Sequence, residues 1–328
     1  MNEPARNQPQ ACPVTALRPA KSPLALAMRR FRRNRLAMVG LALLLIVVSA
    51  SIAGVFWNQW AASRGLPEPY RTPLPGVHPQ PPSFAHPFGT DTLGRDVLAR
   101  TLIGGCVSLG AGLSAAVVSI LIGTFWGIIA GYTGRGTDTV MMRIVDVLYG
   151  LPYILLVILL LVVIPSDPLQ WNLGGWQVEV PSEWVRMVVL FMAIGGVSWL
   201  TMARVVRGQV LALKEAEFVL AARALGSGSA RIILKEMLPN LMGTILVCAT
   251  LTVPLAILQE SFLSFLGLGV PPPLASWGTL ASDAIEALNP VRTYWWLLAM
   301  PCTMLGATLL GLNFVGDGLR DAFDPRSR

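Results

Sequence analysis

Long apolar runs that contain no charged residue recur along this chain. Residues 36–57 form one run of 22, and residues 101–134 form another of 34. About 20 apolar residues in helical conformation match the hydrocarbon thickness of a bilayer. Charged residues make up only 13% of the chain, about half of the share that is usual in soluble domains. The sequence therefore predicts an all-α membrane protein.

Six transmembrane helices follow from these runs and from the prolines and charges that interrupt them. The run at residues 101–134 is too short for two spans and a turn, so it supplies one span with an interfacial lead-in. The first run exceeds the apolar core of about 7–15 residues in a signal peptide, so it is kept as a span. The predicted spans are residues 36–57, 108–131, 145–165, 185–203, 241–270 and 293–316.

The distribution of Lys and Arg predicts the orientation. An even number of spans places both termini on one side, and with that side inside, 19 of the 25 Lys and Arg residues are cytoplasmic. Such a bias is typical of cytoplasmic segments, so both termini are predicted to be cytoplasmic. The basic cluster at residues 29–35 directly precedes the first span and is interpreted as an anchor on anionic lipid. A nucleic-acid partner is not expected, because no basic patch alternates with aromatic residues.

These spans and their flanks divide the chain into five segments. The N-terminal 35 residues form a basic cytoplasmic tail, of which residues 1–25 are predicted to be disordered because they are rich in Pro, Ala and polar side chains. The remaining predicted segments are the first span at 36–57, a periplasmic segment at 58–100, a transmembrane core at 101–317 that includes a cytoplasmic loop at 204–239, and a cytoplasmic C-terminal tail at 318–328.

The loop at residues 204–239 is the one long internal connection, and it is predicted to form a helical elbow parallel to the membrane. Phe218, Ala221, Ala222 and Leu225 follow the spacing of one helical face. Gly226 supplies the left-handed residue that often ends a helix. The two alanines are small enough for the backbone of another protein to approach closely.

A second short helix, residues 230–238, is predicted to follow that turn. Ser229 is the candidate N-cap of this helix, and Pro239 stands where the fifth span is expected to begin.

The stretch Phe218-Val-Leu-Ala-Ala-Arg-Ala-Leu-Gly226, with Leu238-Pro-Asn240 after it, resembles the EAA loop of bacterial binding-protein-dependent ABC importer permeases. The resemblance implies that the loop holds a coupling helix that docks into a separate ATPase subunit. The residues implied in this dock are Glu217, Phe218, Ala221, Ala222, Gly226 and Pro239. Leu220 stands where the motif usually has Glu, and Glu217, one helical turn earlier, is the candidate replacement.

Three further segments are similar to the "C"-type oligopeptide and dipeptide permeases of that family. They are His86-Pro-Phe-Gly-Thr-Asp-Thr-Leu-Gly-Arg-Asp96; Glu260-Ser-Phe-Leu-Ser-Phe-Leu-Gly-Leu-Gly269 followed by Ser276-Trp-Gly278; and Gly316-Asp-Gly-Leu-Arg-Asp-Ala-Phe-Asp-Pro325. The resemblance implies a type I ABC importer permease bundle in the bacterial inner membrane that moves peptides. It also implies a second permease, two ATPase subunits and a substrate-binding protein as partners.

Two rival functions are considered. Related permeases carry nickel chelates or other small solutes on the same architecture, so the cargo alternative stays open at this point. An ion-coupled secondary transporter is less favoured, because inverted repeats and discontinuous helices around midplane charges are not apparent.

Glu260 is the ionisable residue placed most deeply in a predicted span. A carboxylate in a span is costly and marks a functional candidate. One interpretation is a lining group or gate that meets a substrate amine. The favoured one is a hydrogen-bonded structural acid that holds the fifth and sixth spans together.

The remaining polar residues indicate no enzyme. A nucleophile constellation and a phosphate-binding Gly-x-x-x-x-Gly-Lys loop are both missing from the sequence, so the energy source is expected on another chain and no cofactor or metal is predicted. His78 and His86 have no acid at metal-ligand spacing, and the four cysteines are interpreted as structural. Residues 89–96 are expected to form a capped turn, and Arg143 is expected to pair with Asp146.

Overall fold

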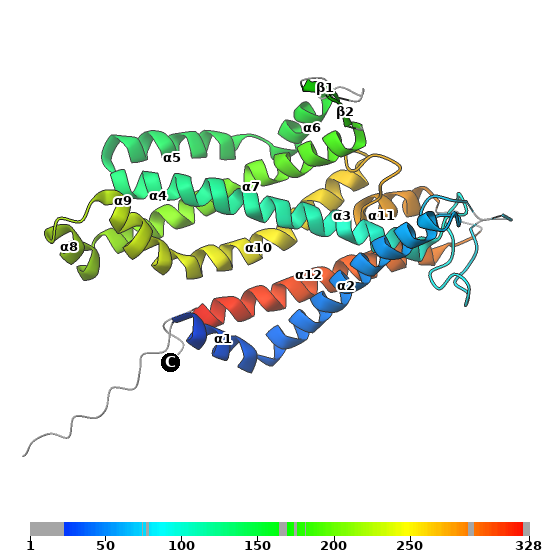
Figure 1. Ribbon diagram of the computed structural model, residues 1–328, viewed down its shortest axis with the longest axis horizontal. Helices are drawn as coiled ribbons and strands as arrows, with labels where there is room; N and C mark the ends of the chain where they lie inside the picture. The colour runs from blue at the N-terminus through cyan, green and yellow to red at the C-terminus, as the bar shows by residue number, and fades with distance from the viewer. Residues whose placement is uncertain are drawn as a thin grey trace, which may run out of the picture.

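The computed structural model describes residues 23–73, 75–76, 79–163, 169–173, 176–180, 182–287 and 292–323. Within this part the chain is an elongated bundle of long helices with a small β-hairpin near one end (Figure 1). The elements are α1 Pro23–Arg33, α2 Arg35–Ser63, α3 Val97–Val118, α4 Thr124–Thr133, α5 Arg135–Gly150, α6 Tyr153–Val163, β1 Leu169–Leu173, β2 Trp176–Val180, α7 Ser182–Lys214, α8 Glu217–Ala224, α9 Ser229–Arg231, α10 Leu238–Phe265, α11 Trp277–Glu286 and α12 Trp295–Phe323.

Five of the described helices are long and apolar enough to cross a membrane. Two of them are composite: π-helical turns at Ser119–Gly123 and Ile232–Met237 join α3 to α4 and α9 to α10. A sixth span arises when α5 and α6, which meet at a bend of 83°, are taken together. The predicted helical membrane bundle is therefore confirmed.

The third and fourth spans differ from the predicted limits for a shared reason. Helix α5 starts at Arg135 rather than near residue 145, and α7 continues past Ala203 to Lys214. Both extensions carry charges, and these charges pair across the two helices. The guanidinium of Arg207 donates two hydrogen bonds to the Asp138 carboxylate, one of 2.7 Å from Nη2 to Oδ2.

Asp146 has a different partner from the predicted one. Its Oδ1 accepts a hydrogen bond of 2.9 Å from Arg204 Nη2 on α7. The expected pairing with Arg143 on the same helix is therefore wrong, because a guanidinium on the neighbouring helix reaches the carboxylate instead.

Glycines allow the helices to pack closely. A Cβ atom at Gly40 on α2 would lie 2.6 Å from Phe314 Cβ on α12, and one at Gly127 on α4 would lie 2.7 Å from the carbonyl oxygen of Ala203 on α7. Both distances are shorter than the distances at which Cβ atoms contact other atoms in proteins. Small residues bring backbones together in this way in membrane bundles, where close van der Waals packing drives association.

The N-terminal helix α1 packs against the end of α12. Ala27 and Phe31 are buried there with Ala37 and Ala322, while Arg29, Arg32 and Arg33 are exposed. Residues 23–25, predicted to be disordered, thus belong to a helix. Residues 1–22, with Cys12, lie outside the described part of the chain, as do His78 and residues 324–328.

The two ends of the bundle carry different elements (Figure 1). Helices α1 and α8 and the C-terminal end of α12 lie at one end, whereas α11 and the segment before α3 lie at the other. The segment between α6 and α7 contains the antiparallel pair β1–β2, in which Leu169 lies opposite Val180. The first and last described helices therefore meet at the end of the bundle that carries α8.

Candidate coupling surface and buried polar sites

Helix α8 is held on the bundle by one buried side chain. Val219 is completely buried in a cluster with Val210 at the end of α7 and with Ile232 and Met237 at the start of the fifth span. Ala222 is half-buried and packs against the same cluster. The anchor Val219 was missed by the sequence reasoning, because it lies off the apolar face defined by Phe218, Ala221, Ala222 and Leu225.

The end of α8 has the geometry expected from its glycine. Gly226 has φ +79°, the Ser227 N–H donates to the Ala222 carbonyl at 3.0 Å, and the Gly226 N–H donates to the Arg223 carbonyl at 3.0 Å. These two bonds define a Schellman motif, in which the residue after the helix adopts the left-handed conformation. A Cβ atom at Gly226 would meet no other atom, so the backbone conformation alone requires glycine here.

The opposite side of α8 is open. Leu220 is 48% exposed, Leu225 is 86% exposed, and Phe218 is 42% exposed. Glu217 and Ala221 are also exposed. The structure thus places three of the predicted docking residues, Glu217, Phe218 and Ala221, on a surface that is mainly apolar and bounded by one carboxylate. Ala222 instead packs against the buried cluster. We call Glu217, Phe218, Leu220, Ala221 and Leu225 the α8 surface.

The second half of the elbow differs from the prediction. Residues 229–265 form one continuous helix, so the expected separate helix at 230–238 is the first part of the fifth span. Gly228, rather than Ser229, is the N-cap residue. Pro239 follows the π-helical turn Ile232–Met237, and a wider turn accommodates a residue that lacks an N–H and whose ring crowds the preceding carbonyl groups.

Glu260 lies in a cage of serine hydroxyls. Its side chain is completely buried, Ser108 Oγ of α3 donates to Oε2 at 3.0 Å, and Ser264 Oγ donates to Oε1 at 2.6 Å. Ser276 Oγ donates in turn to Ser264 Oγ at 3.2 Å, and the Trp277 N–H donates to Ser108 Oγ at 3.2 Å.

This cage supports the structural interpretation of Glu260 but changes the elements involved. The carboxylate joins the fifth span to the second span and to the start of α11, instead of joining it to the sixth span. A buried carboxylate is tolerated when hydrogen bonds satisfy its oxygens. Ser108 and Ser264 supply such bonds, and the spacing of the sequence did not reveal the distant partner Ser108.

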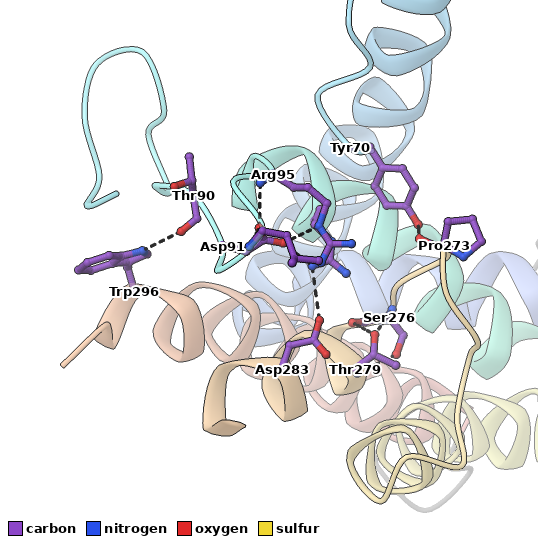
Figure 2. Close-up of polar contacts among 11 residues, drawn as sticks. Tyr70, Thr90, Asp91, Arg95, Pro273, Ser276, Thr279, Asp283 and Trp296 are labelled. Atoms are coloured by element: carbon purple, nitrogen blue, oxygen red, sulfur yellow. Dashed lines mark hydrogen bonds and ion pairs between the residues drawn. The ribbon is translucent and has the colours of Figure 1, made fainter. Parts of the chain in front are cut away.

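The other end of the bundle has an ionic network around Asp91 (Figure 2). The Asp91 carboxylate accepts hydrogen bonds of 2.7 Å from Arg95 Nε and from Arg100 Nη1. Its Oδ1 also accepts from the backbone N–H groups of Leu93 and Arg95, at 3.0 and 2.8 Å. Arg100 Nη1 reaches Asp283 Oδ2 of α11 at 3.4 Å. The network therefore ties the segment before α3 to α11.

The predicted capped turn before the second span is confirmed. Asp96 is the N-cap of α3 and accepts from the Ala99 N–H at 2.9 Å. Its second oxygen lies 2.8 Å from His86 Nδ1. The loop folds back here and brings together His86 and Asp96, which are ten positions apart in the sequence.

Tyr70 fastens the segment before α3 to the loop between α10 and α11. Its hydroxyl donates a hydrogen bond to the carbonyl of Pro273 (Figure 2). Burial raises the pKa of the Tyr70 phenol, so the hydroxyl stays protonated and available as a donor at neutral pH.

The described residues contain no group of three or more His, Cys, Asp or Glu side chains arranged to hold a metal ion. Cys106, Cys248 and Cys302 are free thiols.

Comparison with known proteins identifies relatives over nearly the whole chain. The chain is 46% identical over 302 residues to the oligopeptide transport system permease protein OppC of Bacillus subtilis (strain 168). The matched region covers 92% of this chain and 89% of that protein. It is 43% identical over 312 residues to the dipeptide transport system permease protein DppC of the same organism, covering 95% and 88%. It is 40% identical over 309 residues to OppC of Escherichia coli (strain K12), covering 92% and 91%.

Two family descriptions match separate parts of the chain. Residues 22–82 match the N-terminal transmembrane domain of oligopeptide transport permease C. Residues 123–328 match the inner membrane component of binding-protein-dependent transport systems. With apolar helices of membrane-spanning length and relatives of 40–46% identity, the chain belongs to the family of inner membrane components of binding-protein-dependent transport systems.

Proposed function

We propose that this chain is the permease subunit of an ATP-driven importer that moves di- or oligopeptides across the bacterial cytoplasmic membrane. The observation that carries the proposal is the α8 surface, where apolar side chains are exposed on a helix whose reverse side is anchored by Val219. A soluble partner subunit is the appropriate cover for such a surface. The relatives of this chain are named oligopeptide and dipeptide permeases, and these names support the proposal that the cargo is a peptide.

Coupling follows from where α8 is attached. Val219 contacts a cluster that contains side chains from the end of the fourth span and from the start of the fifth. A displacement of α8 therefore moves both spans together. We infer that two ATPase subunits bind the α8 surface of this chain and of a second permease, and that ATP-driven closure of the ATPases switches the spans between inward- and outward-facing arrangements. Hydrolysis takes place on the ATPases, so the permease itself is not an enzyme.

The orientation and the remaining partners follow from the two ends. The end with α1, α8 and the C-terminal end of α12 is proposed to be cytoplasmic, where the exposed arginines of α1 contact anionic lipid headgroups. The end with α11 and the Asp91 network is proposed to face the substrate-binding protein.

The test is uptake of labelled trialanine by cells that express the complete importer. Depletion of ATP with the proton gradient preserved is expected to stop uptake, whereas collapse of the gradient with ATP preserved is expected to leave it. The reverse result would show a secondary transporter and overturn the proposal.

A further inference from the structure

A cavity of about 530 Å³ opens at the end of the bundle that carries α11. Its volume falls within the range of about 300–1,000 Å³ that is typical of ligand pockets. One wall is apolar and includes Ile158 and Val162 of α6, another is formed by residues 267–272, and a third is α11. Ser264, which donates a hydrogen bond to Glu260, lines the cavity.

Four charged side chains line this cavity, two of each sign. They are Arg100 of α3, Arg186 of α7, and Asp283 and Glu286 of α11. The two acids are one helical turn apart and lie on the same side of α11. A metal cation or a free phosphate would match only one of the two signs. A zwitterion matches both, provided that its charged ends are separated by an uncharged body.

Arg100 is a fixed part of this site. Its side chain is 5% exposed and is held by Asp91 and Asp283 through Nη1. Within the described residues, its buried Nε has no hydrogen-bond acceptor. A buried guanidinium with an unused donor next to a cavity is costly unless a ligand or water supplies the acceptor.

The two acids on α11 are accessible. The Asp283 side chain is 53% exposed, and its contact with Arg100 is long, at 3.4 Å. Glu286 is exposed and forms no ion pair within the described part of the chain. Both carboxylates are therefore available to an ammonium group that enters the cavity.

We propose that this cavity is a receiving site for zwitterionic peptides on the import pathway. Asp283 and Glu286 take the ammonium end, Arg186 takes the carboxylate end, and Arg100 positions Asp283. The inference rests on the proposed import of peptides and assigns the recognition of their charged ends. It also assigns the binding of the peptide's ammonium group to Asp283 and Glu286 rather than to Glu260. Glu260 lies behind Ser264 and does not line the cavity.

The test measures occupancy of the cavity in the purified, reconstituted importer without its binding protein. A Ser282→Cys substitution, in a chain whose native cysteines are replaced by serine, places a thiol in the cavity wall. Its rate of labelling by a membrane-impermeant maleimide is followed with increasing trialanine. Trialanine is expected to protect the thiol, and N-acetyl-trialanine and trialanine amide are expected to protect it more weakly.

Variants that remove one charge then test which side chain binds each end of the peptide. Glu286→Gln is expected to raise the half-protecting concentration of trialanine about 3- to 10-fold and to leave that of N-acetyl-trialanine unchanged. Arg186→Gln is expected to raise the half-protecting concentration of trialanine but to leave that of trialanine amide unchanged. Glu68→Gln is the matched control, since Glu68 lies in the segment before α3 and does not line the cavity.

Equal protection by free and blocked peptides, or equal effects of Glu286→Gln and Glu68→Gln, would overturn the proposed site. The results that would overturn the cavity site can be told apart from those that would overturn the proposed import function. If the parent importer takes up trialanine with ATP but the charge variants do not alter protection, only the cavity assignment fails. If the parent shows no ATP-dependent peptide uptake, both fail.

Discussion

Ser108 Oγ donates a hydrogen bond of 3.0 Å to Glu260 Oε2 and so joins α3 to α10 across 152 positions of sequence. The same serine accepts from the backbone of Trp277 at 3.2 Å. One hydroxyl therefore connects the second span, the fifth span and the start of α11. The predictions for Glu260 follow from this connection.

Glu260→Gln is expected to leave membrane level, assembly and transport close to those of the parent. Glutamine keeps the shape and one acceptor oxygen, and serine hydroxyls both donate and accept, so the cage reorganises without loss of bonds. Glu260→Leu removes every acceptor from the buried hydroxyls and is expected to cost about 1–3 kcal/mol. Thermal unfolding of the purified subunit in detergent measures both variants. A well-folded Glu260→Gln variant that does not transport would instead make Glu260 a pathway group.

The two Arg–Asp pairs between α5 and α7 are expected to differ in strength. In the pair Arg207–Asp138 the side chains are 33% and 15% exposed, whereas in Arg204–Asp146 they are 41% and 61% exposed. Exposed pairs contribute about 0–1 kcal/mol, and neighbouring residues in contact couple by about 0.5–3 kcal/mol. Double-mutant cycles with Ala at each position are expected to give the larger coupling for Arg207–Asp138. Equal coupling energies would show that burial does not strengthen this pair.

The same pairs explain why the limits of two spans were not predictable from the sequence. A hydropathy argument ends a span at a charge, so it ended the fourth span before Arg204 and started the third only after Arg143. The charges on the two helix extensions satisfy one another across the interface, which a scan of one segment at a time does not detect. The uncharged run at residues 36–57 contains no such charge, and there the predicted span lies within one helix, Arg35–Ser63.

The candidate site was predictable in part for a related reason. The glycine stop and the exposed face of α8 follow from local spacing, and both are present. The anchor Val219, the partners of Glu260 and the contact between His86 and Asp96 depend on contacts between distant or folded-back segments. Such contacts are set by the packing of the bundle rather than by local pattern.

Gly40→Leu is expected to separate α2 from α12. A Cβ atom at Gly40 would already lie 2.8 Å from the carbonyl oxygen of Gly311, and overpacking of this kind costs about 1–3 kcal/mol. Gly306→Leu is the matched control on α12, because a Cβ atom there meets no other atom. The midpoint of thermal unfolding in detergent is expected to fall for Gly40→Leu and to stay near the parent value for Gly306→Leu.

The proposed orientation is tested by fusions to a reporter that is active only after export. A fusion after Pro75 is expected to be active, and one after Ser227 is expected to be inactive. A second reporter that is active only in the cytoplasm is expected to give the opposite result at each site. Activity of the exported reporter after Ser227 would place α8 outside the cell and exclude its contact with a cytoplasmic ATPase.

Gly226→Val is expected to uncouple α8 from its ATPase without unfolding the permease. Gly226 has φ +79°, and a β-branched residue in the left-handed region costs about 1–2 kcal/mol locally. Since a Cβ atom there meets no neighbour, the penalty falls on the Schellman turn alone and changes the direction of the chain after α8. Copurification of the ATPase with the tagged permease and ATP-driven peptide uptake are both expected to fall, while membrane level stays normal.

Gly228→Val is the matched control for this variant. Gly228 lies two residues further on, has φ −66° and ψ 153°, and also has open space around its Cβ position. Valine adopts this extended conformation readily, so copurification and uptake are expected to match those of the parent. If Gly226→Val binds the ATPase and transports as Gly228→Val does, the left-handed turn is not required for docking. Equal losses in the two variants would instead show that added bulk in the loop, rather than backbone conformation, disturbs the contact.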